Sequence, residues 1–504
     1  MAASVHSRGA VLGALLAGAA ACTTTGSSSG PSLPGGVILS WGGNSLGQLG
    51  DGTTNQRLKP VQVSSPQSVK AIAAGGNSSM ALTTDGGVFV WGDGQPSPAE
   101  VTGARGAKAI AAGNRHHLAL MPDGSVMAWG DNSLGQLGDT TVTARPSPVQ
   151  VVGLSGVMAI AAAGDQSYAI GPNFSLWSWG DNSMGQLGDG TKAARSPLQP
   201  AQVGTVQVID LAASSTHALA LTTGSEVLGW GSNAECQLLQ DAVSGGNVIC
   251  NDHLSPKTLV TAATGVSTRG AALAAIPKAS LWVLSGGAVQ GTGGGFGTTN
   301  SGLCSPDAAL GNPAVIVGPG PTKASGIAAG AEHVLFHDGD GNVWALGSNT
   351  AGQLGLGTTT VVECATQVPP TSVSGAVALA AGAEHSLALV QGVLEASPAT
   401  LDLGDSDVGK AAAPKALSIR NAGMAPVSIV QVQAIGDGFS ATDSCPRLPS
   451  SLAPGASCAA TIGFTPAALG IQSGALQVTS NAVTPTWQVP LAGKGMLTVV
   501  PFPK

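Results

Sequence analysis

The sequence has few charged and few aromatic side chains. Charged residues make up 9% of the 504 positions, and there is a single tyrosine. A protein that binds the phosphate backbone of a nucleic acid needs a dense set of lysines and arginines. With 20 basic and 27 acidic residues and a net charge of −7, this chain lacks that set, so no nucleic-acid partner is expected.

Long apolar runs are also missing. The longest run near the N-terminus, residues 10–21, has about a dozen residues, whereas a membrane-spanning helix needs roughly 20. Glycine (74) and proline (31) are abundant instead, and both are unfavourable inside a helix. Because 43% of the residues are hydrophobic, there is enough material for a large core, and we expect an all-β chain.

No short motif in the sequence indicates catalysis or a bound group. It contains no phosphate-binding loop ending in Gly-Lys, no His-Glu-x-x-His, no nucleophile turn and no paired catalytic carboxylates. The cysteines do not show the C-x-x-C spacing of zinc or redox sites. We therefore expect no catalytic residues, no cofactor and no metal, and predict that the protein is not an enzyme.

The N-terminus has the layout of an export signal. Arg8 lies in a stretch without acidic residues, the apolar run follows, and three alanines precede Cys22. This pattern predicts a signal peptide over residues 1–21. It resembles a bacterial lipoprotein signal, in which the cysteine is lipidated, although Ala19 stands where leucine is preferred; ordinary secretion is the alternative. Residues 22–36 are predicted to be a flexible tether.

The seven cysteines agree with export. If Cys22 carries a lipid, an even number remains, which suits disulfides in an oxidising compartment. These candidates are Cys236, Cys250, Cys304, Cys364, Cys445 and Cys458. Cys236 with Cys250, and Cys445 with Cys458, would each close a short loop, which leaves Cys304 with Cys364 by elimination. Other pairings are open from the sequence alone.

One segment recurs along most of the chain, beginning with Trp-Gly and ending with Gly-Gln-Leu-Gly. Clear copies begin at Trp41, Trp129 and Trp179, and weaker ones at Trp230 and Leu346. A short copy without the Gly-Gln-Leu-Gly loop begins at Trp91, and a degenerate copy begins at Leu284-Ser285-Gly286. This makes seven copies with a mean spacing of about 51 residues.

A second signature precedes each copy: A-A-G-x-x-H/S followed by alternating apolar residues, as in residues 111–120, 328–336 and 380–389. Between the two signatures lies an Asp-Gly turn such as Asp123-Gly124, which predicts a β-hairpin whose two central residues both have positive φ. Each copy is therefore expected to contain four short strands, the last one flanked by proline. Four strands per repeat match one blade of a β-propeller.

The phase of the repeat predicts how the ring closes. The array opens with a lone strand, residues 37–41, and ends with a hairpin, residues 376–390, that lacks its Trp-Gly strand. These two ends would complete one blade and leave no open sheet edge. We predict a seven-bladed propeller over residues 37–392, with a Gly-rich insertion at residues 286–302.

The pairing of W-G-x-N-x-x-G-Q-L-G with A-A-G-x-x-H resembles the regulator of chromosome condensation repeat family, whose fold is a seven-bladed propeller. The resemblance covers about residues 36–392. The best-known member is an exchange factor for the GTPase Ran that docks on chromatin, and an exported acidic protein meets neither partner. Secreted bacterial members include an inhibitor of β-lactamases that binds through its loop face, so the resemblance implies protein binding.

After Gly392 the repeat stops. Alternating strands at residues 417–420, 426–432, 460–464, 474–479 and 487–491 predict an immunoglobulin-like β-sandwich over residues 393–497, followed by a tail, 498–504. The pattern from Asn421-Ala422-Gly423 through Cys445 and Cys458 to Phe464-Thr465-Pro466 resembles Hydin-like immunoglobulin domains of bacterial surface proteins. That resemblance implies a spacer or adhesion module.

Residues that repeat around the ring are expected to be architectural. Four histidines lie three residues after A-A-G or A-A-S, and Ser78 and Ser167 are assigned to the same position: His116, His217, His333 and His385. A catalytic base is normally unique and needs an orienting partner, so a structural role is favoured over a catalytic one. The repeated tryptophans are likewise interpreted as packing between blades rather than as an aromatic ligand site.

Two further patterns have a structural and a functional interpretation. The repeated glutamines are expected to brace the loops rather than to bind a ligand: Gln48, Gln136, Gln186, Gln237 and Gln353. Residues 338–342 resemble the opening of a calcium loop but lack the glycine at its sixth place and the distal glutamate. Because they coincide with the Asp-Gly turn of other copies, we expect a hairpin turn there.

Together these observations predict a noncatalytic protein of the cell envelope, lipid-anchored or otherwise secreted, that binds a protein partner through propeller loops. One alternative is an enzyme or carbohydrate-binding protein that uses the central opening, where carboxylates or histidines with perturbed pKa values would then converge. The other is an exchange-factor-like regulator of a small GTPase, which would have to reside in the cytosol.

Overall fold

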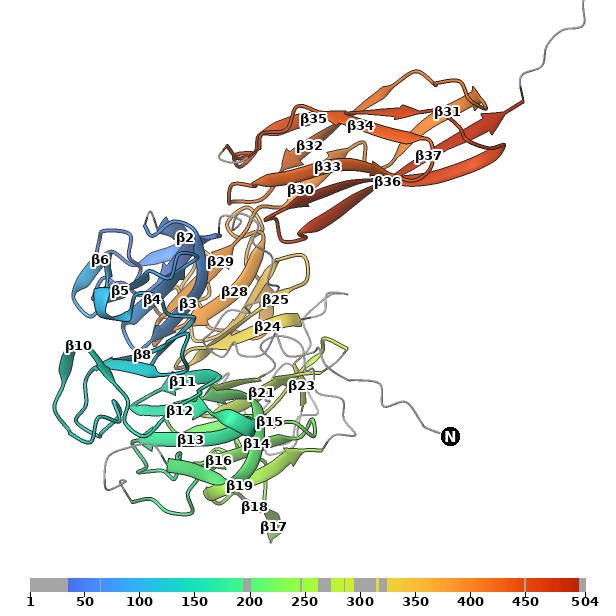
Figure 1. The fold of residues 1–504 in the computed structure, drawn as a ribbon. Helices are drawn as coiled ribbons and strands as arrows, with labels where there is room; N and C mark the ends of the chain where they lie inside the picture. The colour runs from blue at the N-terminus through green and yellow to red at the C-terminus, as the bar shows by residue number, and fades with distance from the viewer. Residues whose placement is uncertain are drawn as a thin grey trace, which may run out of the picture.

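The computed structural model consists of a ring of small sheets followed by a β-sandwich (Figure 1). It describes residues 35–63, 65–193, 201–244, 247–261, 273–284, 286–293, 314–316, 324–447 and 450–497. Within these residues the helical segments are two 3-10 turns, Thr102–Ala104 and Pro172–Phe174. Neither is long enough to cross a membrane. The all-β prediction is confirmed.

Blades 1 and 2 each contain four antiparallel strands in chain order. Blade 1 consists of β3 (Val69–Gly75), β4 (Ser78–Thr83), β5 (Val88–Gly92) and β6 (Gln95–Glu100). Blade 2 consists of β7 (Ala109–Ala112), β8 (His116–Leu120), β9 (Val126–Gly130) and β10 (Arg145–Gln150). The third strand of each blade ends in the Trp-Gly pair, as the repeat predicts.

Blades 3 and 4 share one long strand, β14 (Ala201–Ala213). It is the outer strand of blade 3 and continues as the inner strand of blade 4, so the two blades form one seven-stranded sheet. Blade 3 begins with β11 (Ala159–Ala163), β12 (Gln166–Ile170) and β13 (Ser175–Gly180). Blade 4 continues with β15 (His217–Thr222), β16 (Val227–Gly231) and β19 (His253–Val260), and carries a separate hairpin of β17 (Ala242–Ser244) and β18 (Asn247–Ile249).

Blades 5 and 6 return to four strands each. Blade 5 consists of β20 (Leu273–Ile276), β21 (Ala279–Val283), β22 (Val289–Gly293) and β23 (Ala314–Ile316). Blade 6 consists of β24 (Ala324–Ala329), β25 (His333–Asp338), β26 (Val343–Gly347) and β27 (Val362–Gln367).

Blade 7 joins the two ends of the array. It pairs β28 (Ala376–Ala381) and β29 (His385–Val390) from the C-terminal end with β1 (Val37–Gly42) and β2 (Arg57–Val63) from the N-terminal end. Strand β1 is antiparallel to β29, with Val37 opposite Val390 and Gly42 opposite His385. The predicted closure by both chain ends is confirmed.

Two details of the predicted repeat are wrong. The degenerate copy does not begin at Leu284, because Leu284 and Gly287 form the hairpin turn and the third strand is β22, in which Thr292 takes the position of tryptophan. Residues 286–293 therefore belong to the blade and not to a Gly-rich insertion; residues 294–302 lie outside the described part of the chain.

The Asp-Gly turns also differ from the prediction. Gly86, Gly124 and Gly341 have positive φ, but the aspartates before them do not. In the second turn, Gly124 N donates to Met121 O, and Met121 N donates to Ser125 O. This pattern is a type I turn followed by a left-handed glycine rather than a type I′ turn, because the loop is longer by one residue.

The propeller core lies between neighbouring blades. Trp91 of blade 1, for example, is completely buried in a cluster with Ile38 and Leu387 of blade 7. Such clusters recur around the ring, each drawing apolar residues from two adjacent blades. A single blade could not bury both of its faces, so the ring is the stable unit.

The sandwich follows blade 7 almost without a linker. One sheet has the order β30 (Leu394–Ser397), β32 (Lys415–Asn421), β35 (Ser457–Phe464), β34 (Phe439–Asp443). The other has the order β31 (Leu401–Asp407), β37 (Thr486–Met496), β36 (Gly470–Ser480), β33 (Ile429–Ile435). The predicted sandwich is present. Met424 and Ala425 pack into the apolar cluster at the boundary of blades 6 and 7, which fixes the two parts together.

Candidate functional site: the loop face of the propeller

The propeller has two different faces. One, called here the loop face, carries the Gly-Gln-Leu-Gly loops and the turns between the first and second strands of each blade. Backbone hydrogen bonds join these two features, as from Asp131 N to Arg115 O and from Asp181 N to Asp165 O. The opposite turn face carries the Asp-Gly turns and the connections between blades. Val37 and Val390 lie opposite each other at the turn face, so the chain enters there and the sandwich leaves there.

Each loop is held by one asparagine and one glutamine. In blade 7, Asn44 Oδ1 accepts from Leu49 N at 3.0 Å, and Gln48 Oε1 accepts from Leu46 N at 2.9 Å. Equivalent bonds form in the other loops, for example from Leu134 N to Gln136 Oε1 at 2.9 Å. The glutamines thus satisfy backbone donors inside a turn, which is the bracing role expected from the repeat.

Each loop also contacts the next blade. The Gln48 carbonyl accepts from Trp91 Nε1 at 2.9 Å and from Ser79 Oγ at 2.9 Å. The Gln136 carbonyl accepts in the same way from Trp179 Nε1 and Ser167 Oγ. The tryptophans therefore pack between blades and anchor the preceding loop.

The repeated histidines pair with serines across the same blade boundaries. His116 Nε2 lies 2.8 Å from Ser167 Oγ, and His333 Nε2 lies 2.9 Å from Ser386 Oγ. Because Ser167 Oγ donates its only proton to the Gln136 carbonyl, the proton between histidine and serine must sit on Nε2 of the histidine. The chain of bonds runs from histidine to serine to loop carbonyl.

These histidines are neutral. His116 and His333 are completely buried, and burial lowers the pKa of each to about 3. The Nδ1 atoms of both rings have no hydrogen-bond partner, so a second proton would be buried without an acceptor. A group that stays neutral at physiological pH and is sealed between blades acts as a structural donor.

The structure corrects one assignment in this ring. Ser78 does occupy the histidine position, opposite Gly92, but Ser167 does not: Gln166 lies there, opposite Gly180. Ser167 is the partner of His116 instead. At the boundary of blades 1 and 2 the pair is exchanged, because His117 Nε2 contacts Ser78 Oγ at 3.0 Å.

The central opening is lined almost entirely by small residues. The inner ends of the first strands of all seven blades surround a cavity of about 350 Å³. None of the repeated histidines lines it. The charged residues in its wall are Asp165 and Asp181, and burial together with the charges of Asp131 and Asp181 raises the pKa of Asp165, against the effect of Arg115.

Exposed apolar side chains occupy one equivalent position in three loops. Leu46, Leu134 and Met184 are 39%, 41% and 42% exposed, and each lies two residues before the bracing glutamine. They were not predicted from the sequence, where roles were assigned to the repeated histidines, serines, glutamines and tryptophans. A signal was present: an apolar residue recurs where the neighbouring Asn-Ser and Gly-Gln residues indicate a surface turn.

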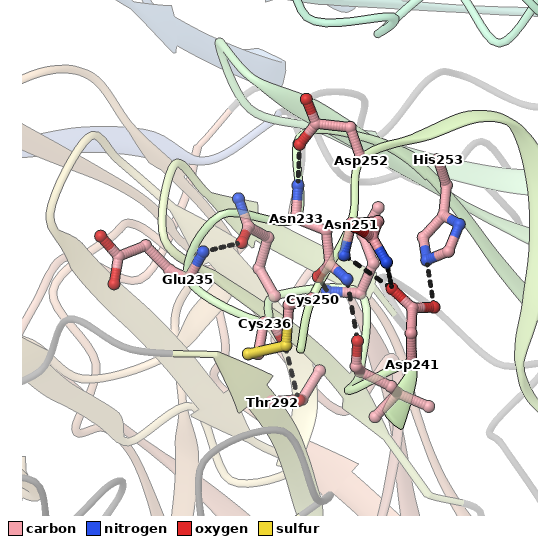
Figure 2. The surroundings of a disulfide bond; sticks show 12 residues. Asn233, Glu235, Cys236, Asp241, Cys250, Asn251, Asp252, His253 and Thr292 are labelled. Carbon is pink, nitrogen blue, oxygen red and sulfur yellow. Dashed lines mark hydrogen bonds and ion pairs between the residues drawn. A yellow bond between two sulfur atoms is a disulfide. The ribbon is translucent and has the colours of Figure 1, made fainter. Parts of the chain in front are cut away.

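The loop of blade 4 departs from the others and carries a disulfide (Figure 2). Cys236 and Cys250 are bonded, so the hairpin β17–β18 is fastened to the loop. Cys236 has φ +57° and Leu239 has φ +70°, where other loops have glycine. Thr292 donates to Cys236 O at 3.1 Å, which replaces the contact that tryptophan makes elsewhere.

The other residues singled out from the sequence are the cysteines and the turn at Asp338. Cys445 and Cys458 form the second local disulfide, in the sandwich. Cys22 and Cys304 lie outside the described residues, as does the side chain of Cys364, so the third pairing stays a prediction. Asp338 Oδ1 accepts from Asp340 N and Asn342 N, as expected of a hairpin turn. Among the described residues no group of histidine, cysteine or acidic side chains is arranged to hold a metal ion.

Comparison with known families agrees with this geometry. The Regulator of chromosome condensation (RCC1) repeat matches residues 35–82, 123–170, 175–221 and 340–389, and a second form of it matches 107–136 and 208–236. This propeller belongs to the RCC1 repeat family. Residues 392–494 match the HYDIN/CFA65/VesB-like, Ig-like domain, so the RCC1 propeller is followed by a domain of that family.

Similar solved structures show the same fold. Human WBSCR16 is 20% identical with a TM-score of 0.60, covering 70% of this chain and 98% of that one. Prp20p from Saccharomyces cerevisiae, described with its binding properties to Gsp1p and histones, is 20% identical with a TM-score of 0.59, covering 71% and 92%. At this identity the likeness concerns the RCC1 fold alone.

Curated relatives match a short part of the chain. The X-linked retinitis pigmentosa GTPase regulators of Canis lupus familiaris and Homo sapiens are each 45% identical over 65 residues. The alignments cover 12% of this chain and 6% of each relative. The alignments therefore show similarity between repeats and carry no information about the function of the whole relatives.

Proposed function

We propose that this chain is a noncatalytic protein of the cell envelope that binds a protein partner through the loop face of its propeller. The observation that carries the proposal is the recurrence of exposed Leu46, Leu134 and Met184 at one loop position. Aliphatic side chains on rigid, hydrogen-bonded loops lose little freedom on binding, which favours their use in an interface.

The direction of the loop face supports the same proposal. Strand β1 begins at the turn face and the sandwich follows β29 from the same face, because Val37 and Val390 lie opposite each other there. The loop face is the opposite face of the propeller. A second hollow of about 390 Å³ opens on the loop face beside Glu332, Glu384 and Lys278, which gives a partner an uneven surface to fit.

The proposed location rests on the disulfides and the N-terminal signal. Cys236–Cys250 and Cys445–Cys458 are typical of proteins from oxidising compartments. We propose that Cys22 is lipidated and anchors the protein. Metabolic labelling with palmitate should mark the wild-type chain and not Cys22→Ser; absence of label from both would favour plain secretion.

The binding proposal is tested by replacing the loop tips in the full chain. A triple variant Leu46→Ser, Leu134→Ser, Met184→Ser should lose the envelope proteins that cross-link to the wild type, measured by quantitative mass spectrometry. The matched control places the same number of serines on the sandwich, at Val430, Leu469 and Ile471, which are also exposed. Loss of the cross-links in the control, or their persistence in the loop variant, would overturn the proposal.

A further inference from the structure

A hollow of about 250 Å³ opens on the turn face, between blades 2 and 3. Its lining residues come from the connection that joins the two blades, residues 153–157, and from the hairpin of blade 3, residues 171–177. They are two glycines, two serines, a leucine, a valine, Pro172 and Trp177, and none of them is charged. The hollow therefore suits a neutral ligand that combines an apolar surface with hydrogen-bonding groups.

Trp177 gives the hollow a fixed aromatic wall. Its side chain packs against the apolar cluster at the boundary of blades 2 and 3, which contains Leu154 and Val157, yet Trp177 stays partly exposed. Trp177 Nε1 donates to Ser175 Oγ at 3.2 Å, and Ser175 Oγ donates to Pro172 O at 2.9 Å. These two bonds hold the indole in one orientation, so little freedom is lost when a ligand stacks on it.

Trp177 is not one of the repeated tryptophans, and its equivalent in blade 6 is placed differently. Trp344 takes that position in blade 6, where Phe336 lies opposite it and stacks on it with ring centroids 6.2 Å apart. Trp344 is only 7% exposed. Opposite Trp177 lies Ala169, so Trp177 lacks the aromatic neighbour that covers Trp344. Packing explains Trp344, whereas the indole of Trp177 has a part left free for a ligand.

The turn of blade 3 leaves room beside the indole. Gly171 has φ −93°, which any residue can adopt, so the backbone does not require glycine there. A Cβ on Gly171 would, however, lie 2.9 Å from Trp177 Nε1 and 3.0 Å from Ser175 Oγ. In the same turn Asn173 and Phe174 have φ +57° and +62°, which costs about 1 to 2 kcal/mol for phenylalanine. Strained backbone of this kind is concentrated at ligand sites.

Two hydroxyl groups provide the polar part of the lining. Ser175 Oγ donates its proton to Pro172 O and accepts from Trp177, which leaves it one acceptor position. Ser155 is exposed, and no other described residue bonds to its hydroxyl. A flat aromatic wall next to uncharged hydroxyl groups matches a sugar ring, whose C–H face is apolar and whose edge carries hydroxyl groups.

We propose that this hollow binds one pyranose ring of a neutral saccharide with the configuration of glucose. All substituents of such a ring are equatorial, so both of its faces present C–H groups that can stack on Trp177. The hydroxyl groups at the ring edge bond to Ser155 Oγ and to the free acceptor position of Ser175 Oγ. The site lies on the turn face, so it is independent of the binding surface proposed on the loop face.

The test measures the binding of cellotetraose and chitotetraose to the full chain by isothermal titration calorimetry. The wild type should bind at least one of the two. Trp177→Leu keeps an apolar side chain in the cluster but removes the aromatic wall, so the affinity should fall about tenfold or more. Phe89→Leu is the matched control, because Phe89 is the equivalent residue of blade 1, lies opposite an alanine and is also partly exposed. It should change the affinity by less than about twofold.

A second variant leaves Trp177 in place. Ser155→Leu removes a hydroxyl and fills the rim from an exposed position, so it should abolish binding while the thermal unfolding midpoint stays unchanged. No binding of either saccharide by the wild type, an unchanged affinity in Trp177→Leu or Ser155→Leu, or an equal loss in Phe89→Leu would overturn the inference. Decaproline that binds in place of the saccharides would assign the hollow to a proline-rich protein segment and would also overturn it. The loop-tip variant should bind the saccharides as the wild type does, so the two proposals fail separately.

Discussion

The buried histidines of the propeller work as fixed donors in a chain of three groups. At the boundary of blades 6 and 7, His333 Nε2 contacts Ser386 Oγ, which donates to Gln353 O at 2.8 Å. Trp41 Nε1 donates to the same carbonyl at 2.8 Å. One loop carbonyl therefore receives two donors from the next blade, and the neutral histidine completes the network.

This chemistry makes the propeller sensitive to acid. In the folded protein the pKa of His333 is about 3, because burial opposes its charge, against an ordinary value of 6.5. Between these values the unfolded chain binds a proton that the folded chain does not. The contribution of His333 to the free energy of unfolding is therefore fully present above pH 6.5 and is lost as the pH decreases toward 3.

We predict that His333→Gln flattens this dependence. Glutamine occupies the same position in blade 3, as Gln166, and does not titrate. Between pH 6.5 and 5 the wild type should lose about 1 to 2 kcal/mol more than the variant, measured by urea unfolding at each pH. Asp51 does not titrate in this window, because hydrogen bonds from Thr53 and Arg57 outweigh burial and lower its pKa from 3.8. Burial raises the pKa of Asp93 and Asp165, but both residues are present in the wild type and in the variant, so their effect cancels in the difference. Parallel curves for the two proteins would contradict the prediction.

At the scale of the element, the loop of blade 4 shows how several substitutions depend on one another. Other loops have glycine beside the next tryptophan: a Cβ on Gly188 would lie 2.9 Å from Trp230 Nε1. After the blade 4 loop the tryptophan position holds Thr292, which leaves space for Leu239. The left-handed backbone at Cys236 and Leu239 costs about 1 kcal/mol per residue, and the disulfide offsets that cost.

We predict that the residue chosen to replace Cys236 determines how much stability is lost. Cys236→Ser with Cys250→Ser removes the disulfide and keeps a strained backbone, whereas Cys236→Gly with Cys250→Ser removes the disulfide and relieves the strain. Both should lose about 3 kcal/mol of loop-closure stabilisation, and the serine variant about 1 kcal/mol more. Guanidinium unfolding of both variants measures the difference; equal stabilities would refute the role of the positive φ.

Elements that carry a short sequence motif could be predicted from the sequence. Features that depend on the neighbouring strand could not. The Trp-Gly strands and Asp-Gly turns follow from short motifs, so six of the third strands were placed correctly. The strand with Thr292 was misplaced because its tryptophan is missing and Leu284 mimics the pattern. Ser167 was misassigned by one position because register depends on the partner strand, where Gln166 faces Gly180.

The candidate site was less predictable than the fold for the same reason. The glutamines and histidines are visible as repeats, and their buried contacts explain why they recur. The backbones of Gln136 and Asp165 both lie beside Gly180, where blades 2 and 3 meet, and no spacing within one repeat reveals this. A repeat pattern predicts the contacts that all blades share and does not predict contacts between residues that differ from blade to blade.

At the scale of the whole molecule, stability depends on the bond between the two ends of the array. Strand β1 brings β2 with it and pairs along its full length with β29. The boundary clusters on both sides of blade 7 contain residues of β1: Ile38 belongs to one, and Leu39 with Trp41 to the other. Removal of β1 would therefore open two boundaries at once.

We predict that a chain beginning at residue 57 fails to unfold as one cooperative unit, whereas a permuted propeller keeps that behaviour. In the permuted chain residues 35–56 follow residue 392 through a short linker, and the sandwich is omitted. Val37 and Val390 are direct neighbours, so this order joins β29 to β1 as an ordinary hairpin. Every strand pair is preserved. The loop between β1 and β2 is cut, but its two ends stay adjacent. Calorimetry should show one sharp transition for the permuted propeller and a broad one for the truncated chain. The truncated chain also ends at residue 392, so both proteins lack the sandwich and the difference between them isolates ring closure. A sharp transition in the truncated chain would mean that the ring is stable without β1.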